Sequence, residues 1–326
     1  MVGLAVIVTV LAVGGVAAFK GVQHWVAGNV ESLGDPFAQV TNRPSPSSTS
    51  DENILVLGSD SRISAGDPSQ WKVGAQRTDA IMLVHLPADR SSAYVMSIPR
   101  DSWVDIPGHA QAKINAAFSW GGPSLLIQTV EQLTNVRIDH FVVTDFDSFV
   151  AMTDALGGVR MTLTKSLTLD GTVVPAGKQQ LLTGAQALAF VRERHSLPHG
   201  DFDRVQRQQA WIRAIAAKLR NDGTLRNPVT STKFLTTVTK SVAADSAFDE
   251  KAQQDLLDRV RGLSSKDITF FTAPYSGTGR SADGQSIVVL DRAQLDPLMK
   301  AMASDTMAAY VADHASDLHE LPAVVS

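Results

Sequence analysis

Four short runs of nearly continuous apolar residues constrain the fold of this chain more than any other feature. A strand with one wet face alternates apolar and polar residues, whereas a run without alternation needs cover on both faces. These runs are rich in Val, Ile, Leu and Met, and we expect them to form central strands. They read NILVLGSD from Asn53, DAIMLVHLP from Asp79, AYVMSIPR from Ala93 and IDHFVVTD from Ile138.

Helical patterns lie between and after these runs, so that strands and helices alternate, which predicts an α/β sandwich. The expected helices are Ile114 to Leu133, Phe146 to Leu156, Thr183 to Phe190, Phe202 to Leu219, Pro228 to Ser241, Glu250 to Gly262 and Arg292 to Ala303.

Charge and cysteine content exclude several functional classes. The formal net charge of −4 argues against a general nucleic-acid binder, which neutralises phosphates over a broad basic face. Cysteine is absent, which excludes disulfides, thiolate nucleophiles and thiolate metal sites. Because the net charge is negative, any basic site must be confined to one part of the surface.

The first residues predict a single-pass membrane anchor. From Val2 to Phe19 the only polar side chain is Thr9, and a helix of this length spans about 27 Å. A cleaved signal peptide and a buried core helix are the alternatives. No Lys or Arg precedes the run and Lys20 follows it, so the positive-inside rule does not fix the orientation, which is consistent with a true start upstream of Met1.

The chain is expected to contain one large domain. We predict an anchor over residues 1–24, a linker over 25–51 that includes the Pro/Ser-rich stretch TNRPSPSSTSD, a catalytic domain over 52–305 and a C-terminal tail over 306–326. No second break in composition follows Asp51.

Arginines gather with acidic residues where the apolar runs are interrupted. The clusters are GSDSR from Gly58, RTD from Arg77, SIPRD from Ser97, RER from Arg192 and DFDRVQRQ from Asp201. In open α/β sheets, ligands bind beyond the carboxyl ends of the strands. We therefore expect Asp60, Arg62, Arg100 and Asp101, which directly follow strand-like runs, to lie at a ligand site.

Spacing groups the remaining cationic residues. On a helix starting near Asp201, the side chains of Arg204, Arg207 and Gln208 share one face. Arg192 and Arg194 would share a face if their segment is extended.

A structural explanation and a functional one compete for these clusters. Acid–arginine pairs within one helix are worth only about 0.2–0.5 kcal/mol each and often serve as surface pairs or caps. Seven arginines in five clusters exceed that need, and guanidinium is the group that grips phosphate oxygens through a planar fork. Asp60 and Asp79 are hard oxygen ligands suited to Mg²⁺. Together these residues indicate a diphosphate site.

The ordered motifs GSDSR, RTDAIMLVHL, SIPRDSWVDIPG, KINAAFSWGGP, FVRERH and DFDRVQRQQ, over roughly residues 52 to 303, resemble the LytR-CpsA-Psr family. The resemblance implies an α/β/α sandwich with a central mixed sheet and an anchor in the cell membrane that leaves the catalytic domain extracellular. It implies a polyprenyl-diphosphate glycan as substrate, with the lipid in an apolar tunnel. The expected helices Ile114 to Leu133 and Phe146 to Leu156 are apolar enough to be walls of this tunnel or ordinary core helices. Such enzymes transfer glycopolymers onto peptidoglycan as phosphodiesters.

Carried over to this sequence, the resemblance associates Asp60 and Asp79 with Mg²⁺. We assign catalysis to Arg77, Arg100 and Asp101, with Asp101 as the proton acceptor. Diphosphate binding is assigned to Arg62, Lys113, Arg192, Arg194, Arg204, Arg207 and Gln208, among which Arg62, Lys113 and Arg207 have the less defined roles.

In the expected reaction, a hydroxyl of peptidoglycan attacks the glycan-side phosphorus and the lipid phosphate leaves. A diphosphate hydrolase and a non-catalytic polyprenyl-phosphate-binding regulator are the alternative functions.

Overall fold

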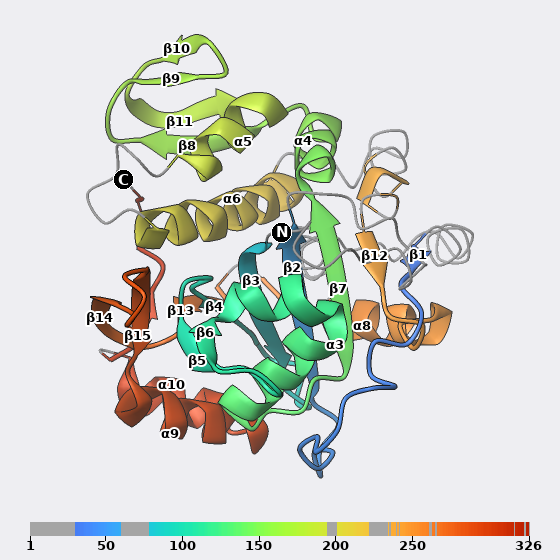
Figure 1. The fold of residues 1–326 in the computed structure, drawn as a ribbon. Coiled ribbons are helices and arrows are strands. Elements are labelled where there is room, and N and C mark those ends of the chain that lie inside the picture. The colour runs from blue at the N-terminus through green and yellow to red at the C-terminus, as the bar shows by residue number, and fades with distance from the viewer. Residues whose placement is uncertain are drawn as a thin grey trace.

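A mixed sheet forms the centre of the fold (Figure 1). The structure, a computed structural model, describes residues 30–59, 78–193, 201–221, 242–260 and 266–315, with short pieces between and after them. Within these residues eight strands follow the order β1 (Glu31–Ser32), β12 (Val242–Ala244), β7 (His140–Asp145), β2 (Glu52–Ser59), β3 (Thr78–Leu86), β4 (Ala93–Ile98), β13 (Ile268–Thr272) and β16 (His319–Glu320).

The four apolar runs form the central strands, as predicted, because both sheet faces are covered. Alternate residues of β2 enter two separate cores: Ile54 and Val56 pack on one face, and Leu55 and Leu57 pack on the other. All four side chains are fully buried. The result is an α/β/α sandwich.

Helices α4 (Phe146–Ala155), α5 (Gly184–Arg192), α6 (Asp201–Asn221) and α8 (Glu250–Val260) contribute to the first core. Helices α3 (Ile114–Thr134), α9 (Arg292–Ala303) and α10 (Met307–His314) contribute to the second. The expected helix Pro228 to Ser241 lies mostly outside the described residues. Since α3 and α4 cover opposite faces of the sheet, they do not face one another across a shared tunnel, and the structure supports their reading as core helices.

The expected helix from Ile114 is broken in its middle. Gly121 and Gly122 leave the helical conformation, and Gly122 has φ 63° and ψ −155°, a backbone region that is essentially restricted to glycine. Pro123 then starts the second half, where its missing N–H does no harm.

Short ribbons that the sequence did not reveal decorate the sandwich. They pair β5 (Trp103–Asp105) with β6 (Gln111–Lys113), β8 (Val159–Leu163) with β11 (Gly177–Leu182), β9 (Leu167–Leu169) with β10 (Thr172–Val174) and β14 (Tyr275–Arg280) with β15 (Ser286–Leu290).

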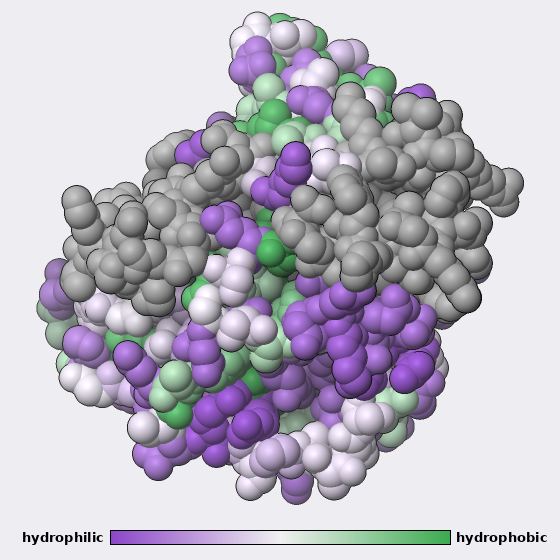
Figure 2. Space-filling model, turned by 90° about the vertical axis from the view of Figure 1, so that its right-hand side faces the viewer, coloured by the Kyte–Doolittle hydropathy of each residue, from purple (hydrophilic) through white to green (hydrophobic). Residues whose placement is uncertain are grey.

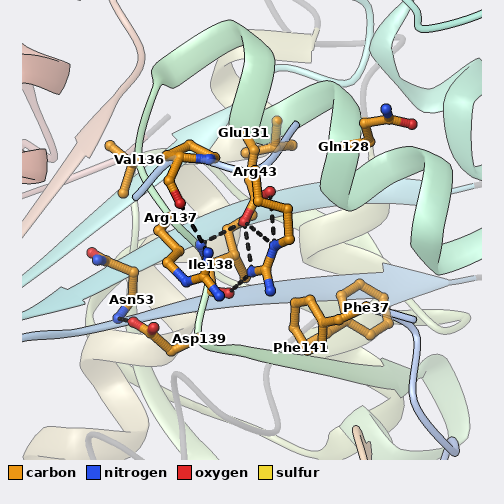
Figure 3. Close-up of polar contacts among 12 residues, drawn as sticks. Phe37, Arg43, Asn53, Gln128, Glu131, Val136, Arg137, Ile138, Asp139 and Phe141 are labelled. Carbon is orange, nitrogen blue, oxygen red and sulfur yellow. Dashed lines mark hydrogen bonds and ion pairs between the residues drawn. The ribbon is translucent and has the colours of Figure 1, made fainter. Parts of the chain in front are cut away.

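The segment expected to be a linker docks on the domain in part (Figure 3). β1 pairs with β12, and Arg43 makes a bidentate ion pair with Glu131 of α3, with the Nη2–Oε1 distance at 2.7 Å. The same guanidinium lies 4.5 Å from the centre of the Phe37 ring. A Pro/Ser composition therefore does not prevent packing here, because one charged pair anchors the segment.

The chain after residue 305 is also part of the fold, since it supplies α10 and the edge strand β16, which pairs with β13. Figure 2 views the molecule from the side of β1, β12 and α8, where hydrophilic residues dominate much of the described surface. Among the described residues no helix is long and apolar enough to cross a bilayer, and the expected anchor from Val2 to Phe19 lies outside them.

Replacing Arg43 by alanine should lower the free energy of unfolding by about 3 kcal/mol, because Glu131, whose side chain is 2% exposed, would lose its cation. Urea unfolding of the full chain measures this change. Lys251→Ala is the control: its ion pair with Asp255 is exposed and should contribute less than about 0.5 kcal/mol. Equal losses in the two variants would contradict the role given to Arg43.

Candidate functional site at the carboxyl edge of the sheet

One edge of the sheet collects the ends of the central strands. β2 is parallel to β7, and β4 is parallel to β13. β3 is antiparallel to both β2 and β4. The strands β2, β4, β7 and β13 therefore all run in one direction, and β3 runs in the opposite one. Their carboxyl ends and the start of β3 therefore meet at one edge, as expected for a ligand site.

A β-bulge marks this edge. Gly58 pairs with Ala80 and Ser59 pairs with Thr78, which leaves Asp79 as the extra residue of β3. Ile81 pairs with Ile98 on the other side, so Asp79 and Arg100 each lie two residues beyond the same pair. Bulges commonly re-aim side chains beside active sites. The backbone position of Asp79 thus agrees with a role at this edge.

The turn that carries Arg100 is fixed from several directions. The Ser102 amide donates to the Pro99 carbonyl at 3.0 Å, and the Asn115 amide of α3 donates to the Arg100 carbonyl at 3.2 Å. On the other side the Val288 amide donates to the Asp101 carbonyl at 2.8 Å. Arg100 itself is partly buried. The backbone therefore holds this arginine in place before any ligand binds.

Asp101 and Lys113, both predicted site residues, form an ion pair. Lys113 Nζ lies 3.1 Å from Asp101 Oδ1, and the two side chains are 22% and 21% exposed. The pair is accessible from solvent. Asp101 directly follows Arg100, and the Arg100 carbonyl accepts from the amide of Asn115, two residues after Lys113, so the structure brings these three predicted residues together.

Helix α6 crosses the same edge (Figure 1). Gln209 Nε2 donates to Ser97 Oγ at 2.7 Å and to the Phe271 carbonyl at 3.0 Å, which ties the helix to the ends of β4 and β13. Two turns earlier, Phe202 stacks on Tyr275, with ring centres 4.1 Å apart. The first two turns of α6 therefore lie over the strand ends.

Arg204 and Gln208 lie on these turns and are each 4% exposed. Their spacing of four residues places them on one stripe of the helix, as predicted. Gln208 Oε1 is buried and has no hydrogen-bond partner among the described residues. A buried polar atom of this kind points to a polar ligand or to a partner elsewhere in the chain.

Arg207 has a different environment from the one expected of a diphosphate ligand. It is fully buried, and its Nη1 donates to the Phe190 carbonyl of α5 at 3.0 Å. Its guanidinium also stacks over the Phe190 ring at 4.1 Å. Burial lowers the pKa of Arg207 to about 10, so it stays protonated at neutral pH. Arg207 therefore joins α5 to α6.

Arg192 lies in the last turn of α5 and is exposed. The condition under which it would share a face with Arg194, an extended segment, is therefore not met at Arg192, and extended backbone begins at Glu193. Arg194, Asp60, Arg62 and Arg77 lie outside the described residues, and only the backbone of Asp79 is described. Within the described part of the chain, no three His, Asp or Glu side chains form a metal-binding group.

Sequence reasoning missed two residues that shape this edge. Gln209 was overlooked because one of its partners is a backbone carbonyl, which leaves no trace in the sequence. Tyr275 follows β13, and its pKa is raised by burial and by the nearby Asp203 carboxylate. No motif in the sequence distinguishes Tyr275 from an ordinary strand tyrosine.

The fold and the site together define a class: an α/β/α sandwich with cationic and amide side chains at the carboxyl edge of its sheet, where an anionic ligand can bind. The chain belongs to the LytR_cpsA_psr family, which matches residues 26–304. This confirms the resemblance seen in the motifs.

Two relatives and one solved structure illustrate the match. Cell wall biosynthesis protein LcpA of Corynebacterium glutamicum is 30% identical over 315 residues, covering 82% of this chain and 60% of LcpA. Polyisoprenyl-teichoic acid–peptidoglycan teichoic acid transferase TagU of Enterococcus faecalis is 31% identical over 245 residues, covering 74% of this chain and 76% of TagU. The structure of TagT bound to LI-WTA is 26% identical and matches with a TM-score of 0.61, covering 78% of this chain and 90% of TagT.

Gln209→Leu should destabilise the protein by about 1–3 kcal/mol, because it leaves the Ser97 hydroxyl and the Phe271 carbonyl buried without this donor. Denaturant unfolding of the full chain measures the loss. Gln285→Leu is the matched control, since Gln285 is exposed in a turn and should change stability by less than about 0.5 kcal/mol. We call the two hydrogen bonds from Gln209 to Ser97 and Phe271 the clamp of α6. A Gln209 variant as stable as this control would show that the clamp is dispensable.

Proposed function

We propose that this protein transfers a glycopolymer from a polyprenyl-diphosphate carrier to peptidoglycan during cell wall assembly. Membership of the LytR_cpsA_psr family supports the proposal, as do the names of relatives such as LcpA and TagU. The observation that carries it is the clamp of α6 on β4 and β13, which brings Arg204 and Gln208 to the edge where Arg100 follows β4.

Phosphoryl transfer suits such a site because its charge is spread over oxygen atoms that fixed donors can stabilise. Arg100 and Arg204 would grip the diphosphate oxygens, and the amide of Gln208 would orient them. The acceptor oxygen forms a bond to the glycan-side phosphorus while the bond to the lipid phosphate breaks, so a lipid monophosphate leaves. The acceptor proton passes to a base, a role that we assign to Asp101.

Asp60 and Asp79 would hold Mg²⁺, which supplies positive charge beside the phosphates. The donor types fit this ion, and Ser59, the described residue before Asp60, pairs with Thr78, the residue before Asp79. Residues 1–24 would anchor the protein in the cell membrane, with the catalytic domain outside the cell.

Arg100→Ala should abolish transfer, a loss of at least about a hundredfold, because a fixed cation would be removed from the transition state. Arg204→Lys should also lower the transfer activity, since an ammonium group cannot reproduce the planar, bidentate contact of a guanidinium with phosphate oxygens. Mass analysis after incubation of the full chain with a lipid-diphosphate glycan, peptidoglycan oligomers and magnesium detects the phosphodiester product. Retained activity in the Arg100 variant, with unchanged thermal stability, would count against the site.

A second experiment separates the transferase from a non-catalytic binder and from a hydrolase. Asp79→Asn should eliminate product formation while the donor still binds through the arginines, because a neutral amide is a much poorer magnesium ligand. Donor binding and product formation are measured on the same preparation. A binder would give no product even as wild type, and a hydrolase would release free phosphorylated glycan without an acceptor.

A further inference from the structure

The β5–β6 ribbon carries an unbroken row of polar and aromatic side chains away from Arg100. Trp103 pairs with Lys113 and Asp105 pairs with Gln111, and directly opposed residues of antiparallel strands share a face. Asp101 precedes Trp103 by two residues, and its carboxylate reaches Lys113 at 3.1 Å. Five side chains therefore form one surface, which we call the ribbon face: Asp101, Trp103, Asp105, Gln111 and Lys113.

The ribbon face looks outward because the opposite face is packed. Val104 is 5% exposed and joins the core that includes Phe118 of α3, and Ala112 packs against the same core. On the outer side Asp105 and Gln111 are exposed and Trp103 is half-buried. The indole is also held in place, since Trp103 Nε1 donates to Gln111 Oε1 at 3.1 Å.

This combination suits a sugar chain. A pyranose ring has an apolar C–H face that can stack on an indole, and hydroxyl and acetamido groups around its rim that need donors and acceptors. The ribbon face offers one indole between carboxylates, an amide and an ammonium. From Asp101 to Asp105 it extends about 13 Å, which is longer than one sugar ring. A single indole offers too little apolar surface to anchor a protein partner. It is similar in size to one pyranose ring, so it suits a glycan.

We propose that the ribbon face binds the acceptor glycan strand, with Trp103 stacking on one of its sugar rings. This inference rests on the proposed function, because it treats the surface continuous with Arg100 and Asp101 as the approach path of the acceptor. Trp103 would be a specificity-determining residue: it holds a ring next to the one that presents its hydroxyl to the diphosphate.

Calorimetric titration of the full chain, purified in mild detergent without donor, tests the proposal. The probes are a β-1,4-linked N-acetylglucosamine tetramer and the glycan fragments released from peptidoglycan by a muramidase. Trp103→Ala should weaken binding by about tenfold, equivalent to about 1.4 kcal/mol. Trp103→Phe should stay within about threefold of wild type, because it keeps an aromatic face.

Trp120→Ala is the matched control. Trp120 is 39% exposed but belongs to α3, and its ring lies tilted at 39° against His109 with ring centres 4.8 Å apart. We expect glycan binding by this variant to equal that of wild type. An equal loss in the Trp120 and Trp103 variants, no loss in Trp103→Ala, or no binding of either probe by wild type would overturn the proposal.

Transfer kinetics distinguish failure of this inference from failure of the proposed function. Trp103→Ala should raise the KM for the acceptor about tenfold and leave donor binding unchanged. If the protein is an active transferase and Trp103→Ala leaves the KM for the acceptor unchanged, the inference is overturned and the proposed function stands. Glycan binding that depends on Trp103, in a protein that forms no product, would support the ribbon face and refute the transferase.

Discussion

Two hydrogen bonds from one buried amide organise the functional edge of this protein. Gln209 donates to Ser97 Oγ of β4 and to the Phe271 carbonyl of β13, two parallel neighbours in the sheet. Apolar packing alone would leave α6 free to shift along the sheet, since the hydrophobic effect has no direction. The two hydrogen bonds instead fix the position of α6 along the direction of β4 and β13. Arg204 and Gln208 are then positioned by the helix itself relative to the strand ends.

The same edge shows two ways of burying a guanidinium. Removing such a cation from water is costly unless protein groups replace the lost hydration. Arg207 is compensated by a carbonyl and an aromatic ring, and it serves as a joint between helices. Arg204 is nearly as buried, and it lies about one turn closer to the N-terminus of α6. Charges held in such poorly solvated surroundings act on an anion more strongly than surface charges do, because water screens them less.

The sequence predicted most reliably those features that local physics determines. Burial on both sheet faces left continuous apolar runs, so the central strands were found, and helical spacing grouped Arg204 with Gln208. Features that depend on distant partners were not predicted. Arg43 finds Glu131 across 88 residues, the three-residue strands of the β5–β6 ribbon are too short to show a period, and the bulge at Asp79 arises only when β2 and β3 pair.

The architecture also explains how two substrates could reach one phosphorus. An in-line displacement needs the attacking and leaving groups on opposite sides of that atom. Helix α6 packs through Trp211 into the core on one face of the sheet, whereas the β5–β6 ribbon packs through Val104 into the core on the other. The turn that carries Arg100 follows β4, a strand buried between these two layers. In the proposed reaction, one layer therefore holds the donor and the other presents the acceptor. An enzyme built on a single sheet face would have to bring both substrates in from the same side.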